Sequence, residues 1–151
     1  MDKESILEEL SAAKLAHLKW VKRAKSLISG MSMEKEGIPV ECTDCVFGKW
    51  FYSTGQDMII KPGMTVLESI GTKHTEFHQI YFKIFQVYFS DEEKSFFSKF
   101  LNIKRKISPS EQEMAEGYYA ELEVVSKELL DLLSKLERRI SALDRDFFSA
   151  K

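Results

Sequence analysis

The chain has 151 residues, of which 44% are hydrophobic and 30% are charged, as in ordinary globular proteins and unlike disordered ones. This length suffices for one compact domain with a real core, so we expect residues 1–151 to form a single domain. The net charge of −2, from 22 basic and 24 acidic residues, gives no electrostatic reason to expect nucleic acid or an anionic membrane as a partner.

The chain lacks the features of a membrane or secreted protein. No uncharged apolar run approaches the roughly 20 residues that a membrane helix needs, and the N-terminus "MDKESILEEL" is acidic where a signal peptide would be basic. We therefore expect a cytoplasmic protein. In that reducing compartment Cys42 and Cys45 are better interpreted as thiols or metal ligands than as a structural disulfide.

The first expected element is a helix over residues 3–28. Its apolar residues recur at alternating steps of three and four, which is typical of a bundle helix, and His17 falls on the same stripe. Gly30 is suited to end this helix. Residues 31–44 show no periodicity and contain Gly37 and Pro39, so they predict a loop.

Two further helical segments follow the loop. The aromatic block "CVFGKWFYS" predicts about two helical turns starting at Cys45 and closed off by "TGQD". Residues from Met64 to about Phe89 predict a longer helix, and His74 again falls on its apolar stripe.

Capping boxes mark the starts of the last two helices. Ser90 with Glu93 predicts a helix over "DEEKSFFSKFLN", and Ser108, followed by Pro109 and Glu111, predicts one that runs to about Phe148. Four leucines of this last helix lie seven residues apart, a repeat that could pack inside the monomer or form a seam with a second chain; they are Leu122, Leu129, Leu136 and Leu143. The expected fold is all-α: a four-helix bundle with an additional short helix and a long C-terminal helix.

All three histidines of the chain fall on apolar stripes, and His74 and His78 are one helical turn apart on one face. A single histidine on such a stripe is usually a hydrogen-bonded core residue. Burying three without a common partner would leave several ring nitrogens to satisfy separately, at about 1–3 kcal/mol for each unpaired group. A shared metal ion would satisfy three at once.

Two metal sites can be drawn from these residues. The first combines Cys42 and Cys45 with His74 and His78, but zinc fingers space their two ligand pairs by about 12–15 residues in a hairpin–helix unit that this stretch does not resemble. It also leaves His17 unexplained. The second combines His17, Cys45, His74 and His78, a set of nitrogen and sulfur donors that suits tetrahedral Zn²⁺.

Three motifs in order along the chain resemble the chemoreceptor zinc-binding (CZB) domain family. They are "HLKW" from His17, "CVFGKWF" from Cys45 and "HTEFH" from His74 to His78, and the resemblance spans residues from about 10 to 85. It implies that His17, Cys45, His74 and His78 hold one Zn²⁺, with Trp20, Phe47, Gly48 and Trp50 packed around them. For Gly48 we expect either a close helix approach or an unusual backbone angle.

Cys42 has no counterpart in the family motif. It is either a neutral loop cysteine or a second thiol near the site, and we favour the former because free cysteine commonly behaves as a small apolar residue.

The same residues argue against an enzyme. A zinc protease helix needs glutamate directly after its first histidine, whereas Thr75 follows His74. Four protein ligands would also close the coordination sphere to an activated water. A di-iron bundle needs more histidines and carboxylates, and the chain has no glycine-rich phosphate loop.

The resemblance further implies a regulatory module in bacterial signalling, of the chemotaxis or cyclic-di-GMP type, that responds to zinc availability or to cysteine oxidation. The chain starts at Met1 and has no output domain, so we expect a free-standing module that acts through a signalling partner in trans or as the homodimer typical of the family. The alternative is a helical scaffold or adaptor in which the zinc is purely structural.

Overall fold

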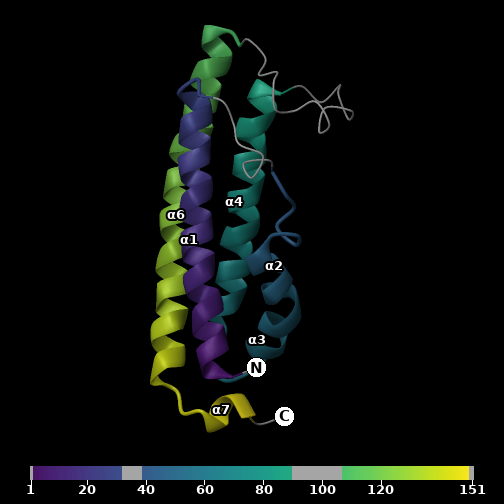
Figure 1. Ribbon diagram of the computed structural model, residues 1–151, viewed down its shortest axis with the longest axis vertical. Coiled ribbons are helices and arrows are strands. Elements are labelled where there is room, and N and C mark those ends of the chain that lie inside the picture. The colour runs from purple at the N-terminus through teal and green to yellow at the C-terminus, as the bar shows by residue number, and fades with distance from the viewer. Residues whose placement is uncertain (1, 32–38, 90–106, 150–151) are drawn as a thin grey trace.

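Three long helices form the body of the protein in the computed structural model, which describes residues 2–31, 39–89 and 107–149. They are α1 (Lys3–Ile28), α4 (Val66–Tyr88) and α6 (Pro109–Ala142), and they lie side by side along the long axis, with α1 and α4 running in one direction and α6 in the other (Figure 1). The described residues contain no strand. The predicted all-α bundle is thus confirmed.

The long helix α6 packs against both α1 and α4. Four of its leucines are fully buried within the single chain, and we call them the leucine seam: Leu122, Leu129, Leu133 and Leu136. Three members of the predicted seven-residue repeat therefore belong to the monomer core. Burial of each of these leucine side chains contributes about 1.5–3 kcal/mol to the stability of the fold.

The helix starts agree with the sequence-based predictions. Asp2 caps α1 by accepting a hydrogen bond from the Ser5 backbone N–H at 2.8 Å. Ser108 caps α6 through a complete capping box with Glu111. At the end of α1, Gly30 adopts a φ of 85°, the left-handed conformation that glycine supplies most cheaply at a helix terminus.

A short helical segment completes the bundle on the side left open by α6. It consists of α2 (Val46–Trp50), a π-helical turn η2 (Phe51–Gly55) and α3 (Gln56–Ile59), and Figure 1 shows it beside α4. The prediction that "TGQD" closes off the aromatic helix is therefore wrong. Gly55 is buried against the rings of Trp50 and Phe51, so it packs inside the segment instead of ending it.

The segment docks on α4 through one close contact. A Cβ atom at Gly71 of α4 would lie 2.6 Å from the ring of Phe51, well inside van der Waals contact. The aromatic ring of Phe51 therefore rests directly on the α4 backbone, and this fixes how closely η2 and α4 approach.

The C-terminal helix is shorter than predicted. It ends at Ala142, and a separate short helix, α7 (Asp146–Ser149), follows. Lys3 at the start of α1 donates hydrogen bonds to the carbonyls of Ser141 and Leu143, so it satisfies acceptors that the end of a helix leaves unpaired. The predicted helix over residues 91–102, with its Ser90–Glu93 capping box, lies outside the described residues.

No helix in the described part of the chain combines the length and the apolar character needed to cross a membrane.

Candidate metal centre

The four predicted ligands come together where α1, α2 and α4 meet. His17 lies on α1, His74 and His78 lie on α4, and Cys45 is the N-cap residue of α2. One donor atom from each residue lies within 4.8 Å of the others. We call these four residues the ligand cluster. Its three histidines are buried and Cys45 is half-buried.

Cys45 owes its position to the first turn of α2. Its Sγ accepts a hydrogen bond from the Gly48 backbone N–H at 3.2 Å, as an N-cap side chain does. A Cβ atom at Gly48 would lie 1.7 Å from the carbonyl oxygen of Cys42, so only glycine admits this close approach. The close approach expected at Gly48 is present, but the Cys42 carbonyl of the preceding turn makes it and not another helix. The φ of Gly48 is not positive.

Two histidines have their ring orientation fixed by backbone carbonyls. The Nδ1–H of His17 donates to the Ala13 carbonyl at 2.7 Å, and that of His78 donates to the Val40 carbonyl at 3.0 Å. Because a carbonyl only accepts, both rings are held in the tautomer that leaves Nε2 with a free lone pair. Metal-bound histidines typically have such a partner on the second nitrogen.

The remaining polar atoms of the cluster lack sufficient partners. The Nε2 atom of His78 and the Nδ1 atom of His74 are buried and have no hydrogen-bond partner among the described residues. The Nε2 atom of His74 lies 3.2 Å from the Sγ atom of Cys45, close to the roughly 3.5 Å that separates neighbouring ligands in a tetrahedral zinc site. The donor set and the unpaired Nε2 atom of His78 both fit a bound Zn²⁺.

The cluster favours neutral imidazoles. Burial, followed by the neighbouring imidazoles, lowers the pKa of His74 to about 2, and burial lowers the pKa of His78 to about 4. Burial also lowers the pKa of His17 against the opposing effect of its bond to Ala13. Neutral imidazole is the form that binds a metal, so proton competition at neutral pH is weak.

Burial raises the pKa of the Cys45 thiol, while the N–H groups of Gly48 and Phe47 act in the opposite direction. A bound cation would stabilise the thiolate, because coordination deprotonates a thiol.

Aromatic rings enclose the cluster. The ring of His17 lies 5.0 Å from that of Phe77 and 6.0 Å from that of Phe47, and the ring of His78 lies 5.2 Å from that of Trp20. Phe47 and Phe77 are buried. The expected packing around the site is confirmed for Phe47 and Trp20. Water is excluded from most of the cluster, and donors in such surroundings hold a cation more strongly.

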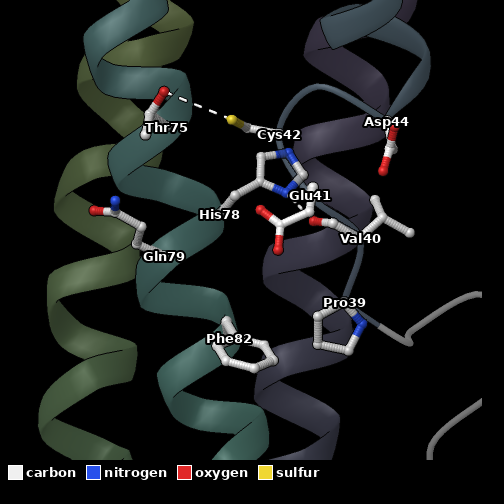
Figure 2. Close-up of a pocket in the computed structure, with 9 residues that line it drawn as sticks. All are labelled: Pro39, Val40, Glu41, Cys42, Asp44, Thr75, His78, Gln79 and Phe82. Carbon is white, nitrogen blue, oxygen red and sulfur yellow. Dashed lines mark hydrogen bonds between the residues drawn. The ribbon is translucent and has the colours of Figure 1, made fainter. Parts of the chain in front are cut away.

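Cys42 does not join the cluster but lies beside it. Its Sγ lies 3.7 Å from the hydroxyl oxygen of Thr75 and 3.8 Å from that of Tyr52, in a cleft of about 510 Å³ that His78 also lines (Figure 2). Cys42 is half-buried. Both predicted alternatives placed Cys42 outside the ligand set, and the position of its thiol in this cleft agrees with the less favoured one, a second thiol near the site.

The comparison with family models agrees with this geometry. An all-α bundle with a cluster of three histidines and one cysteine defines a candidate metal-binding module. Residues 17–85 match the model of the chemoreceptor zinc-binding domain, and the resemblance noted in the sequence is thereby confirmed over that range. Searches of curated proteins and of solved structures gave no match.

Three contributors to the site could not be found in the sequence. The carbonyls of Ala13 and Val40 orient two rings, and backbone groups carry no residue-specific signal. The third is the Cys42 carbonyl, which approaches Gly48: a close approach at this glycine was expected, but not the group that makes it. A glycine in the first turn of a helix was its one visible sign.

Proposed function

We propose that the protein is a zinc-binding regulatory module that binds one Zn²⁺ through His17, Cys45, His74 and His78. The observation that carries this proposal is the convergence of three neutral imidazoles and one thiol in an apolar enclosure, with the Nε2 atom of His78 left unpaired. A bound Zn²⁺ supplies a common partner for all four donors. We further propose binding without catalysis, since four protein ligands would leave no open position for water.

The regulatory step rests on how the cluster connects the helices. His17 belongs to α1, Cys45 to α2, and the two remaining ligands to α4. Cys45 thus ties α2 to the two long helices, and detachment of its thiolate would free the start of that segment. A zinc-bound thiolate is also the form of cysteine that oxidants attack. We propose that zinc loss or Cys45 oxidation changes how α2, η2 and α3 dock, and that a signalling partner or a second copy detects this change.

Zinc titration tests the site. The wild-type chain and the Cys42→Ser variant should each bind one Zn²⁺ with similar affinity. His17→Ala and Cys45→Ser should each bind at least about 10-fold more weakly, since each loses a ligand. If His17→Ala binds one Zn²⁺ as tightly as wild type, the three-histidine site is wrong and the two-cysteine set has to be reconsidered.

Hydrogen exchange then separates a regulatory site from a structural one. A regulatory module should yield its Zn²⁺ to a mild chelator and exchange faster across residues 46–59 while α6 stays protected. A structural site should keep its metal until the whole bundle unfolds. In the second case the protein would be a scaffold or adaptor.

A further inference from the structure

The ligand cluster can be approached along two clefts that flank the segment from Val40 to Cys45. His78 lines both of them. It is 7% exposed, its side chain reaches from α4 towards this segment, and its Nε2 atom has no partner among the described residues (Figure 2). His78 is thus the one residue of the ligand cluster that lines both clefts.

The two clefts differ in chemistry. The smaller, of about 230 Å³, is lined by the apolar side chains of Ala16, Trp20 and Phe47, and also by His17, Asp44 and Cys45. The larger, of about 510 Å³, presents the side chains of Glu41, Cys42 and Asp44 together with the Thr75 hydroxyl. A divalent cation loses hydration water only where other donors replace it, because an unpaired buried charge is very costly. Asp44 lines both clefts, whereas Glu41, Cys42 and Thr75 line the larger cleft alone. The larger cleft therefore offers a thiol and oxygen donors outside the ligand cluster that can replace hydration water on the way in.

Cys42 occupies a defined place between solvent and the cluster. Within the described part of the chain its Sγ makes two long contacts, both with hydroxyl groups. Its backbone carbonyl lies against Gly48 and accepts from the Cys45 Sγ at 3.6 Å. The turn that carries Cys42 is therefore held beside Cys45, with hydrogen bonds from the Asp44 and Cys45 N–H groups to the Glu41 carbonyl. A thiol so placed can rotate about its own side-chain bonds while the backbone stays fixed.

We propose that Cys42 is a transfer ligand, which binds the entering or leaving Zn²⁺ in the larger cleft and exchanges it with His78 and Cys45. This inference rests on the proposed zinc site and adds a route to it. On entry, the Cys42 thiol loses its proton to water and forms a sulfur–zinc bond. When His78 Nε2 and the Cys45 Sγ replace it, the proton of the Cys45 thiol passes to the departing Cys42 thiolate, so the whole transfer releases one proton to water. Because Cys42 substitutes for a departing ligand, exchange avoids an intermediate that has lost one ligand outright.

A transfer ligand has a kinetic signature. It lowers the barrier in both directions and leaves the bound state unchanged, so its removal slows capture and release equally without altering Kd. A permanent ligand would instead raise Kd when removed, and a residue without a role would change neither quantity.

Stopped-flow mixing with zinc chloride and a chromophoric chelator tests the proposal on the full chain. We expect Cys42→Ser to slow capture and release by about 10-fold, the factor that corresponds to about 1.4 kcal/mol at the barrier, with Kd within about twofold of wild type. Glu41→Gln should slow capture to a smaller extent. Thr43→Ala, an exposed neighbour in the same turn that does not line the cleft, and Asp57→Asn, an exposed acid on α3, serve as matched controls.

Two outcomes would overturn the inference while leaving the zinc site intact. One is exchange rates for Cys42→Ser that equal those of wild type and Thr43→Ala. The other is a Kd raised 10-fold or more, which would make Cys42 a resident ligand. Failure of the wild-type chain to bind one Zn²⁺ would instead overturn the proposed function itself.

Discussion

The leucine seam and the ligand cluster join the same helices by opposite means. The seam attaches α6 to α1 and α4 through fully buried hydrocarbon, so its contribution depends neither on proton concentration nor on metal. The ligand cluster attaches α2 to α1 and α4 through buried polar atoms, two of which lack partners. Such a cluster is favourable only when something satisfies it.

The bundle therefore has two parts: a permanent part, whose packing does not involve the ligand cluster, and a conditional part, whose packing does. Helices α1, α4 and α6 can hold together whatever the state of the cluster, because the seam does not use it. The segment from α2 to α3 relies on the cluster together with its aromatic contacts. A regulatory module needs this division, since its conditional part has to change while the fold persists.

The largest expected effect comes from the permanent part. Leu129→Ala removes a fully buried side chain and should lower the free energy of unfolding by about 2–5 kcal/mol. Chemical denaturation with and without Zn²⁺ measures this, and the loss should be the same in both conditions. Val124→Ala, an exposed position on the same helix, should change stability by no more than about 0.5 kcal/mol. A zinc-dependent loss for Leu129→Ala would show that the seam and the cluster are coupled.

The next effect is the pH dependence of the zinc-free protein. The pKa of His74 is lowered to about 2 and that of His78 to about 4, so the unfolded chain binds more protons than the folded chain below the ordinary histidine pKa of about 6.5. Stability is therefore complete above about pH 6.5 and falls as the pH drops, by about 1.4 kcal/mol at pH 5.5 for each of the two imidazoles.

Denaturation of the zinc-free chain at pH 7.5 and pH 5.5 measures this loss. A variant that carries both His74→Leu and His78→Leu is the matched control, and its stability should vary much less over the same range. A zinc-free wild-type chain that is equally stable at both pH values would contradict the burial of neutral imidazoles.

The sequence predicted the parts of the fold that depend on local pattern. Each of the three long helices has an apolar stripe, α1 and α6 also begin at a capping side chain, and α1 was predicted with its observed bounds. The continuation of α2 into α3 was missed because a glycine such as Gly55 is typical of a turn or a helix end. In the structure Gly55 is buried against aromatic rings inside the helical segment. The end of α6 at Ala142 was missed as well, since Lys3, from the opposite end of the chain, binds its last carbonyls.

The candidate site divides in the same way. The placement of the histidines on apolar stripes and the spacing of His74 and His78 follow from helix periodicity. The contact of the Val40 carbonyl with His78, and the direction in which the thiol of Cys42 points, depend on the path of residues 39–45 across α4. No local pattern encodes that path.

Replacing His74 should raise the stability of the zinc-free protein and lower its affinity for zinc. His74 is fully buried and its Nδ1 atom has no partner among the described residues. His74→Leu should therefore stabilise the zinc-free protein by about 1–2 kcal/mol, because an unpaired polar group is replaced by hydrocarbon of similar volume. The same variant should lose tight zinc binding, as shown by titration. Lower stability of the zinc-free variant would mean that the imidazole is satisfied in solution, by water or by rearrangement.

The smallest effect lies far from the cluster, at the start of α6. Ser108→Ala removes the cap oxygen that accepts from the Glu111 N–H and should cost about 1 kcal/mol in the free energy of unfolding. The zinc affinity should stay unchanged, because no cluster ligand lies on α6. A fall in both the stability and the zinc affinity would mean that fraying of α6 reaches α4 and displaces His74 and His78. The packing of the three long helices would then set the zinc affinity of the ligand cluster.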